Sequence, residues 1–80
     1  MENLEKYNQA FLESFEIDQS ALKENLAYND IPEWDSIGHM GLIAALEDAF
    51  DIAMETDDII DFSDFNKGKE VMAKYGVTIN

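Results

Sequence analysis

The chain has 80 residues, which is enough for one small domain (residues 1–80) and too few for a second hydrophobic core. Hydrophobic residues make up 46% of it, too many for a disordered tail. Its 18 acidic residues against 5 lysines give a net charge of −13, which argues against binding to nucleic acid or to membranes. Without a cysteine, a secretory leader or a span of roughly 20 apolar residues, the sequence predicts a cytoplasmic protein.

The segment 3–15 has the hydrophobic spacing of an amphipathic helix. Its large apolar residues recur at steps of three, four and one, so that they share one stripe, while charged and amide residues fill the opposite face. The stripe consists of Leu4, Tyr7, Phe11, Leu12 and Phe15.

Between residues 17 and 35 the pattern is weaker. Ser20 can cap a single helical turn over residues 21–26. Beyond that turn, Pro32 lacks an amide donor and biases the residue before it away from helix, which predicts irregular chain. The apolar anchors expected in this long connection are Leu22, Leu26, Ile31 and Trp34.

Residues 36–50 have the strongest helical pattern, and either Asp35 or Ser36 can cap its start. Gly38 and Gly41 each cost roughly 0.8–1 kcal/mol relative to alanine inside a helix. Either a close-approaching backbone or ligand uses the missing side chains, or the helix tolerates two poor residues. The broad apolar face expected to pack inward consists of Ile37, Met40, Ile43, Ala44, Leu46 and Phe50, widened by Leu42 and Ala45.

Two further helices complete the predicted fold. Residues 56–61 offer a cap and one short turn, and a last helix begins at residues 63–65 and stops at Gly76. Its inward residues are expected to be Phe65, Val71, Met72 and Tyr75. The sequence therefore predicts an all-α, small four-helix bundle with three longer helices and one short third helix.

Ser36 is the residue best placed for chemistry, because it opens a helix directly after an irregular loop. Its hydroxyl can serve as an N-cap or can be modified, and a helix N-terminus favours an attached phosphate. A catalytic serine would need a base, an orienting group and an oxyanion hole, and a small bundle has little room for a cleft. His39 lies three residues further on, but a lone histidine is expected on the exposed face of the helix.

A dedicated metal site is not expected. The acidic residues Asp57, Asp58, Asp61 and Asp64 could attract hard cations, but their spacing lacks the central glycine and closing glutamate of an EF-hand loop. A single histidine and the absence of cysteine argue against zinc or iron.

An ordered block of residues begins at the start of the strongest helix: Asp35-Ser36-Ile37, Met40, Leu42-Ile43, Ala45-Leu46-Glu47-Asp48 and Phe50-Asp51. This block resembles the acyl carrier protein family, whose Asp-Ser-Leu attachment motif opens the second of four helices. In that family the helix ends in a Leu-Glu-acid-x-Phe pattern. Length, helix order and acidity extend the resemblance over nearly the whole chain, although only residues 35–51 are specific.

The resemblance implies that Ser36 carries a covalent 4′-phosphopantetheine arm, transferred from coenzyme A by a phosphopantetheinyl transferase. The arm's thiol would hold an acyl or aminoacyl group as a thioester, which fits a chain without cysteine. The protein would then be a substrate and shuttle, not an enzyme, and a monomer. Its other partners would be acyl- or aminoacyl-loading enzymes and acyltransferases with basic docking patches, in fatty-acid synthesis or a dedicated biosynthetic pathway.

The same resemblance assigns partner recognition to a few residues of this helix: Asp35, Ile37, Met40, Glu47 and Asp48. Met40 could equally be core, which is the interpretation favoured here. Gly38 and Gly41 occupy positions where carriers of this family commonly have acidic residues, so the negative charge beside the arm is lower here. If the bundle sequesters a short acyl chain, as carriers of this family can, the candidate lining residues are Phe50, Met54, Ile59 and Ile60.

Two other classes of function stay open at this point. Charge alone is compatible with a non-catalytic acidic module that binds a basic protein partner. A small hydrolase built on Ser36 and His39 is the third and weakest hypothesis.

Overall fold

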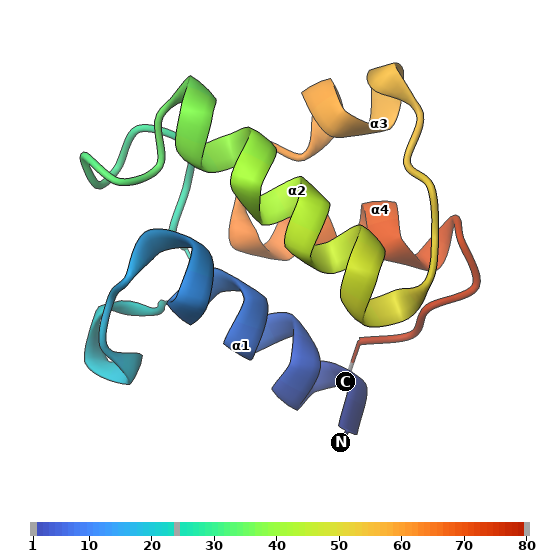
Figure 1. Ribbon diagram of the computed structural model, residues 1–80, viewed down its shortest axis with the longest axis horizontal. Helices are drawn as coiled ribbons and strands as arrows, with labels where there is room; N and C mark the ends of the chain where they lie inside the picture. The colour runs from blue at the N-terminus through green and yellow to red at the C-terminus, as the bar shows by residue number, and fades with distance from the viewer. Residues whose placement is uncertain (1, 24, 80) are drawn as a thin grey trace.

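The computed structural model describes residues 2–23 and 25–79. It contains helix α1 (Glu2–Phe15), a short 3-10 turn η1 (Gln19–Ala21) and helices α2 (Ser36–Phe50), α3 (Thr56–Asp61) and α4 (Phe65–Ala73), and these described residues form no β-strand (Figure 1). The prediction of an all-α domain with three longer helices and one short third helix is confirmed.

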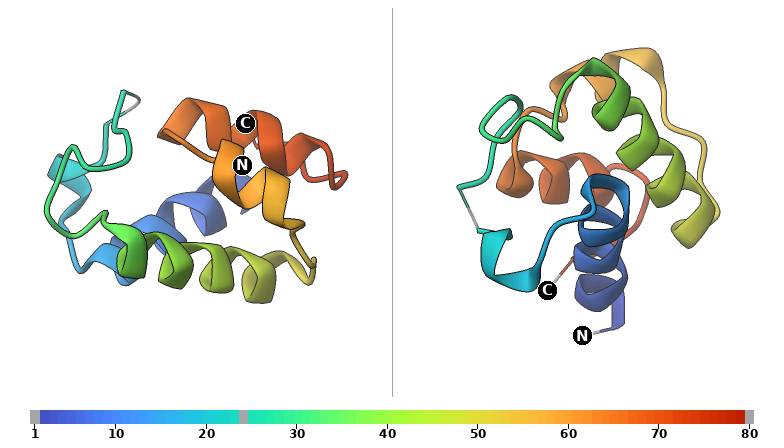
Figure 2. Two further views of the ribbon diagram at one scale, coloured as in Figure 1. Left: turned by 90° about the horizontal axis from the view of Figure 1, so that it is seen from above. Right: turned by 60° about the vertical axis from the view of Figure 1, so that its left-hand side comes forward.

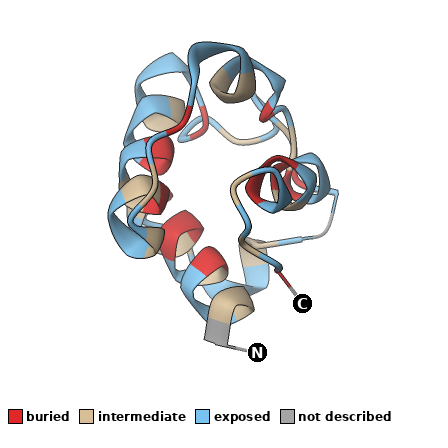
Figure 3. Ribbon diagram, turned by 90° about the vertical axis from the view of Figure 1, so that its right-hand side faces the viewer, coloured by how far each residue is buried: buried red, intermediate tan, exposed pale blue. Residues whose placement is uncertain are grey.

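The helices enclose one hydrophobic core. α1 and α2 run side by side in opposite directions and α4 lies behind α2 (Figures 1 and 2). The start of α3 lies beside the C-terminal end of α4. α1, α2 and α4 turn their buried residues inward and their exposed residues outward (Figure 3). The largest fully buried side chains are Tyr7, Phe11, Phe15, Trp34, Leu42, Ile43, Leu46, Phe62, Val71 and Met72.

Aromatic rings dominate the centre of this core. Phe11 contacts Phe15, Trp34, Phe62 and Phe65, with ring centroids between 5.1 and 6.1 Å apart. The stripe predicted for α1 is therefore confirmed at its three aromatic positions. Trp34 is confirmed as the anchor of the long connection, because its side chain is fully buried.

Two predictions are wrong, one about a helix boundary and one about a buried face. The helical turn expected over residues 21–26 is instead η1, which contains Ser20 and is preceded by Asp18 at the cap position. α2 was expected to turn Ile37, Met40 and Ala44 inward, but all three are exposed. The helix buries Leu42, Ile43 and Leu46. Since α2 is apolar on both sides, its hydrophobic period does not determine which side faces α1.

Gly68 has a packing role that the sequence pattern did not predict. It is buried in α4, and a Cβ atom there would lie 2.2 Å from the Tyr7 hydroxyl and 2.3 Å from the Phe62 ring. Gly76 ends the turn after α4 with a φ of 79°, as expected of a C-terminal glycine.

Candidate functional site

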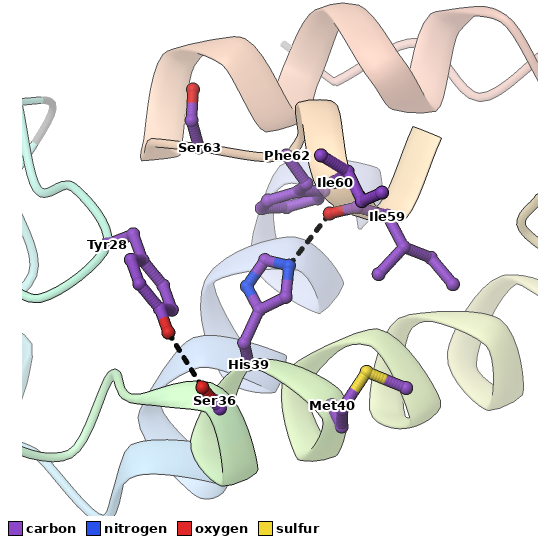
Figure 4. A pocket seen from close by; sticks show the side chains of 8 residues that line it. All are labelled: Tyr28, Ser36, His39, Met40, Ile59, Ile60, Phe62 and Ser63. Atoms are coloured by element: carbon purple, nitrogen blue, oxygen red, sulfur yellow. Dashed lines mark hydrogen bonds between the residues drawn. The ribbon is translucent and has the colours of Figure 1, made fainter. Parts of the chain in front are cut away.

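Ser36 is the first residue of α2, and its side chain is exposed. Asp35 is the N-cap: its backbone is extended and its Oδ1 accepts a hydrogen bond from the Gly38 amide at 2.8 Å. The Oγ of Ser36 lies 3.0 Å from the hydroxyl oxygen of Tyr28 (Figure 4). The cap thus belongs to Asp35, which leaves the Ser36 hydroxyl available to other groups.

The two glycines of α2 have different environments. A Cβ atom on Gly38 would lie 2.0 Å from the carbonyl oxygen of Glu33, so Gly38 allows the connection before α2 to approach the helix closely. Around Gly41 no atom apart from its chain neighbours and the backbone of α2 lies within 4 Å of that position. The close-approach interpretation therefore holds for Gly38, with the chain's own loop as the neighbour.

The connection before α2 is folded back on itself. Asn29 adopts a left-handed conformation with a φ of 71°, and its amide donates to the carbonyl of Trp34 at 3.0 Å. The Asp30 carboxylate accepts a hydrogen bond from the Ala27 amide at 2.9 Å. These contacts hold Tyr28 at one end of a tight loop whose other end is the Ser36 helix start.

The same connection is tied to the segment between α3 and α4. The amide of Tyr28 donates to the carbonyl of Ser63 at 2.9 Å, and the amide of Phe65 donates to the carbonyl of Leu26 at 2.8 Å. These two bonds form a short antiparallel bridge, which holds the backbone of Tyr28 where its side chain can reach Ser36. The two segments that the bridge joins are nearly forty residues apart in the chain, and no local sequence signal predicts their pairing.

His39 was expected on an exposed face, and this prediction is wrong. The indole N–H of Trp34 donates to its Nδ1 at 2.9 Å, and its Nε2 lies 2.8 Å from the carbonyl oxygen of Ile59 (Figure 4). Because Nδ1 accepts, Nε2 carries the proton and donates to Ile59. Both ring nitrogens are engaged, so His39 has no free nitrogen to act as a base toward Ser36.

A hollow of about 420 Å³ opens next to Ser36, between α2 and α3. Its walls are mainly apolar and aromatic (Figure 4). The lining residues are Tyr28, Ser36, His39, Met40, Ile59, Ile60, Phe62 and Ser63. We call this hollow the Ser36 pocket.

The Ser36 pocket contains only part of the residues predicted to surround a cargo. Ile59 and Ile60 line it, whereas Phe50 and Met54 do not. Met40 also lines it, and its side chain is 55% exposed, so the interpretation of Met40 as core is wrong. Tyr28 was missed, although a large aromatic beside the turn-forming pair Asn29-Asp30 was a signal that could have drawn attention to it.

The predicted partner-recognition residues are divided between surface and structural roles. Ile37 is 84% exposed at the start of α2, and Asp48 is exposed near its end. The Glu47 carboxylate accepts a hydrogen bond from the Met54 amide at 2.8 Å, which fixes the connection after α2. Asp35 uses one oxygen as the helix cap.

The acidic residues around α3 form intramolecular contacts. Asp58 accepts hydrogen bonds from Lys74, at 3.0 Å, and from the Tyr75 hydroxyl. These two hydrogen bonds lower the pKa of Asp58, and the bond from Tyr75 has the larger effect. The same bonds raise the pKa of Lys74 and the pKa of Tyr75. Asp64 caps α4 through the Lys67 amide. Among residues 2–23 and 25–79, no group of three or more histidine or acidic side chains is arranged to hold a metal ion.

Comparisons with protein-family models, with curated proteins and with solved structures find no match for the chain. In the part of the chain that the structure describes, no helix is both long and apolar enough to cross a membrane. The function therefore has to be inferred from the residues and their geometry.

Proposed function

We propose that the chain is a carrier protein of the acyl-carrier type. Ser36 would receive a 4′-phosphopantetheine arm, and the thiol of the arm would carry an acyl or aminoacyl group to partner enzymes. The observation that carries the proposal is the position of Ser36, an exposed hydroxyl on the first residue of α2 beside an apolar pocket. A separate N-cap, Asp35, leaves that hydroxyl free for modification.

The chemistry of attachment suits this position. Ser36 Oγ would attack the coenzyme A phosphorus that bears pantetheine, forming an O–P bond. The bond from that phosphorus to the adenosine bisphosphate breaks, and the leaving group takes the electron pair. The hydroxyl proton passes to a base of the transferase. The resulting phosphodiester anion lies at the N-terminus of α2, where the helix dipole and unpaired amides favour negative charge.

The geometry favours a shuttle over a hydrolase. Among the described residues, the hydrogen-bond partner of Ser36 is a tyrosine hydroxyl, which is a weak base, and the nearby His39 is fully engaged with Trp34 and Ile59. Ile37 and Met40 would make apolar contacts with the modifying and loading enzymes, and Asp48 would face their basic patches. Glu47 would contribute charge from its fixed position on the same helix.

Mass spectrometry tests the proposal directly. The unmodified protein, incubated with coenzyme A, Mg²⁺ and a broad-specificity phosphopantetheinyl transferase, is expected to gain the mass of one phosphopantetheine. Ser36→Ala should gain nothing, while Ser20→Ala, which removes an exposed hydroxyl in η1, should be loaded like the wild type. An unloaded wild type, or loading that survives Ser36→Ala, would contradict the proposal.

A second function is supported by the surface. The net charge of −13 accompanies exposed apolar side chains at Ile37, Met40 and Ile60, a combination that fits a non-catalytic module bound by a basic protein. Binding to such a partner would weaken with salt and would be unaffected by Ser36→Ala. A carrier would instead require Ser36 for every downstream transfer.

A further inference from the structure

We propose that Tyr28 is a positioning residue for Ser36, an inference that rests on the carrier function proposed above. Its phenol hydroxyl orients Ser36 Oγ before modification and hydrogen-bonds the phosphodiester group afterwards. The two oxygens are 3.0 Å apart, and the Tyr28 side chain forms a wall of the Ser36 pocket (Figure 4). Tyr28 is 37% exposed, so this contact lies at the surface that a modifying enzyme has to reach.

The backbone of Tyr28 is held from two sides. Its amide donates to Ser63, which belongs to the connection between α3 and α4. The turn that follows is closed by the Ala27 amide on the Asp30 carboxylate and by the Asp30 amide on the Ala27 carbonyl, each at 2.9 Å. The phenol is therefore carried on a fixed segment of backbone.

The ring of Tyr28 is held as well. It packs edge-to-face against the His39 ring, with centroids 5.7 Å apart and an interplanar angle of 87°. His39 is in turn fixed by hydrogen bonds at both nitrogens, one from the fully buried Trp34 and one to the carbonyl of Ile59. A chain of contacts thus runs from the core to the Ser36 hydroxyl, which is the kind of supporting shell that pre-organises a reactive group.

The numbers of protons and lone pairs on the Tyr28 and Ser36 hydroxyls determine which of the two can donate the hydrogen bond. Before modification, each oxygen has one proton and can accept or donate. When Tyr28 donates, the proton of Ser36 points away from it and is available to a base of the transferase. After modification Oγ has no proton, so Tyr28 has to be the donor, and an anionic phosphodiester accepts a stronger hydrogen bond than a neutral hydroxyl does.

Tyr28→Phe tests the role, with Tyr75→Phe as the matched control. Each removes one phenol hydroxyl from a tyrosine that forms hydrogen bonds, but Tyr75 bonds to Asp58 and to the Glu55 amide. We expect Tyr28→Phe to lower kcat for arm transfer about three- to tenfold, the range for one hydrogen bond, with little change in KM or Tm. The ³¹P chemical shift of the loaded phosphodiester should also move. Tyr75→Phe should leave kcat and the ³¹P shift unchanged and lower Tm.

The outcomes separate this inference from the carrier proposal. If the wild type is loaded and Tyr28→Phe has the same kcat and the same ³¹P shift, Tyr28 has no positioning role, although the carrier function stands. A merely structural role for Tyr28 predicts a lower Tm without a ³¹P change, and that result would also overturn the inference. A wild type that accepts no arm would refute the carrier proposal itself.

Discussion

The two helices that flank the Ser36 pocket are held in different ways. α2 is fixed by side-chain packing, since Leu42, Ile43 and Leu46 are almost completely buried. α3 has six residues and buries none of them. Its Ile59 side chain is only partly buried against the core. The helix is also held by hydrogen bonds, from His39 to the Ile59 carbonyl and from side chains of the α4 end to Asp58.

One wall of the pocket is thus backed by fully buried side chains, and the other by one partly buried side chain and a few polar contacts. Burial of apolar area is distributed over many atoms, whereas a hydrogen bond contributes about 1 kcal/mol and is lost in a single step. We therefore expect α3 to have a lower local stability than α2, and the following variants test that expectation from the largest effect to the smallest.

Leu46→Ala should have the largest effect. It removes a fully buried side chain of α2, and such changes cost about 2–5 kcal/mol through lost burial and the remaining cavity. Ile37→Ala is the control, because isoleucine has the same number of carbon atoms as leucine and Ile37 is 84% exposed on the same helix. This change should alter the free energy of unfolding by no more than about 0.5 kcal/mol. Urea unfolding of the two variants measures both, and equal losses would contradict the assignment of the two faces.

Gly68→Ala should destabilise the domain by about 1–3 kcal/mol, the cost of overpacking a core. The added methyl would press on Tyr7 and on Phe62, the residue that follows α3. Gly41→Ala is the control, because open space surrounds that position and alanine is the better helix former by up to about 1 kcal/mol. Thermal melts of the pair should shift in opposite directions; a shift of the same sign would contradict this prediction.

His39→Phe should release α3 in particular. The variant keeps an aromatic ring beside Tyr28, Trp34 and Phe62 but removes both hydrogen bonds of the imidazole. We expect a loss of about 1–2 kcal/mol and faster amide exchange in α3 than in α2. Uniform acceleration of exchange across both helices would show that α3 is not a separate unit.

Asp58→Asn should have the smallest effect, and one that depends on pH. In the folded protein the pKa of Asp58 lies below its ordinary value of 3.8, chiefly because the Tyr75 hydroxyl donates to the carboxylate. The ionised carboxylate therefore stabilises the fold above pH 3.8, and this stabilisation is lost as the pH falls through the lowered pKa. The variant should melt a few degrees below the wild type at pH 7, and the gap should close in acid. A gap that stays constant with pH would mean that Asp58 acts through shape alone.

The helices were predictable from the sequence because their signals are local. The stripe over residues 3–15, the cap at Asp35 and the stop at Gly76 each depend on neighbours within one or two turns. The exposed face of α2 was not predictable in this way, since a helix that is apolar on both sides has no unique inward stripe.

Ser36 could be singled out from its place at a helix start, but its surroundings could not. The contacts of His39 with Ile59 and of Tyr28 with Ser63 join segments that are distant in the chain, and the contact of Tyr28 with Ser36 spans an irregular loop. They depend on how the long connection before α2 folds, and Pro32 and the left-handed Asn29 indicate only that it is irregular. Tertiary contacts of this kind have no periodic signature.

The two ends of the chain lie close together and far from Ser36, so either end is a suitable place to attach a label. The side-chain Nδ2 of Asn3 donates to the Thr78 carbonyl at 3.0 Å, and both ends lie on the opposite side of the molecule from the start of α2 (Figure 1). A fluorophore, a surface linker or a fused protein attached at either end would therefore leave the Ser36 hydroxyl and the pocket uncovered. The domain can be immobilised by one end, so that the loading and unloading proposed for Ser36 can be followed on single molecules.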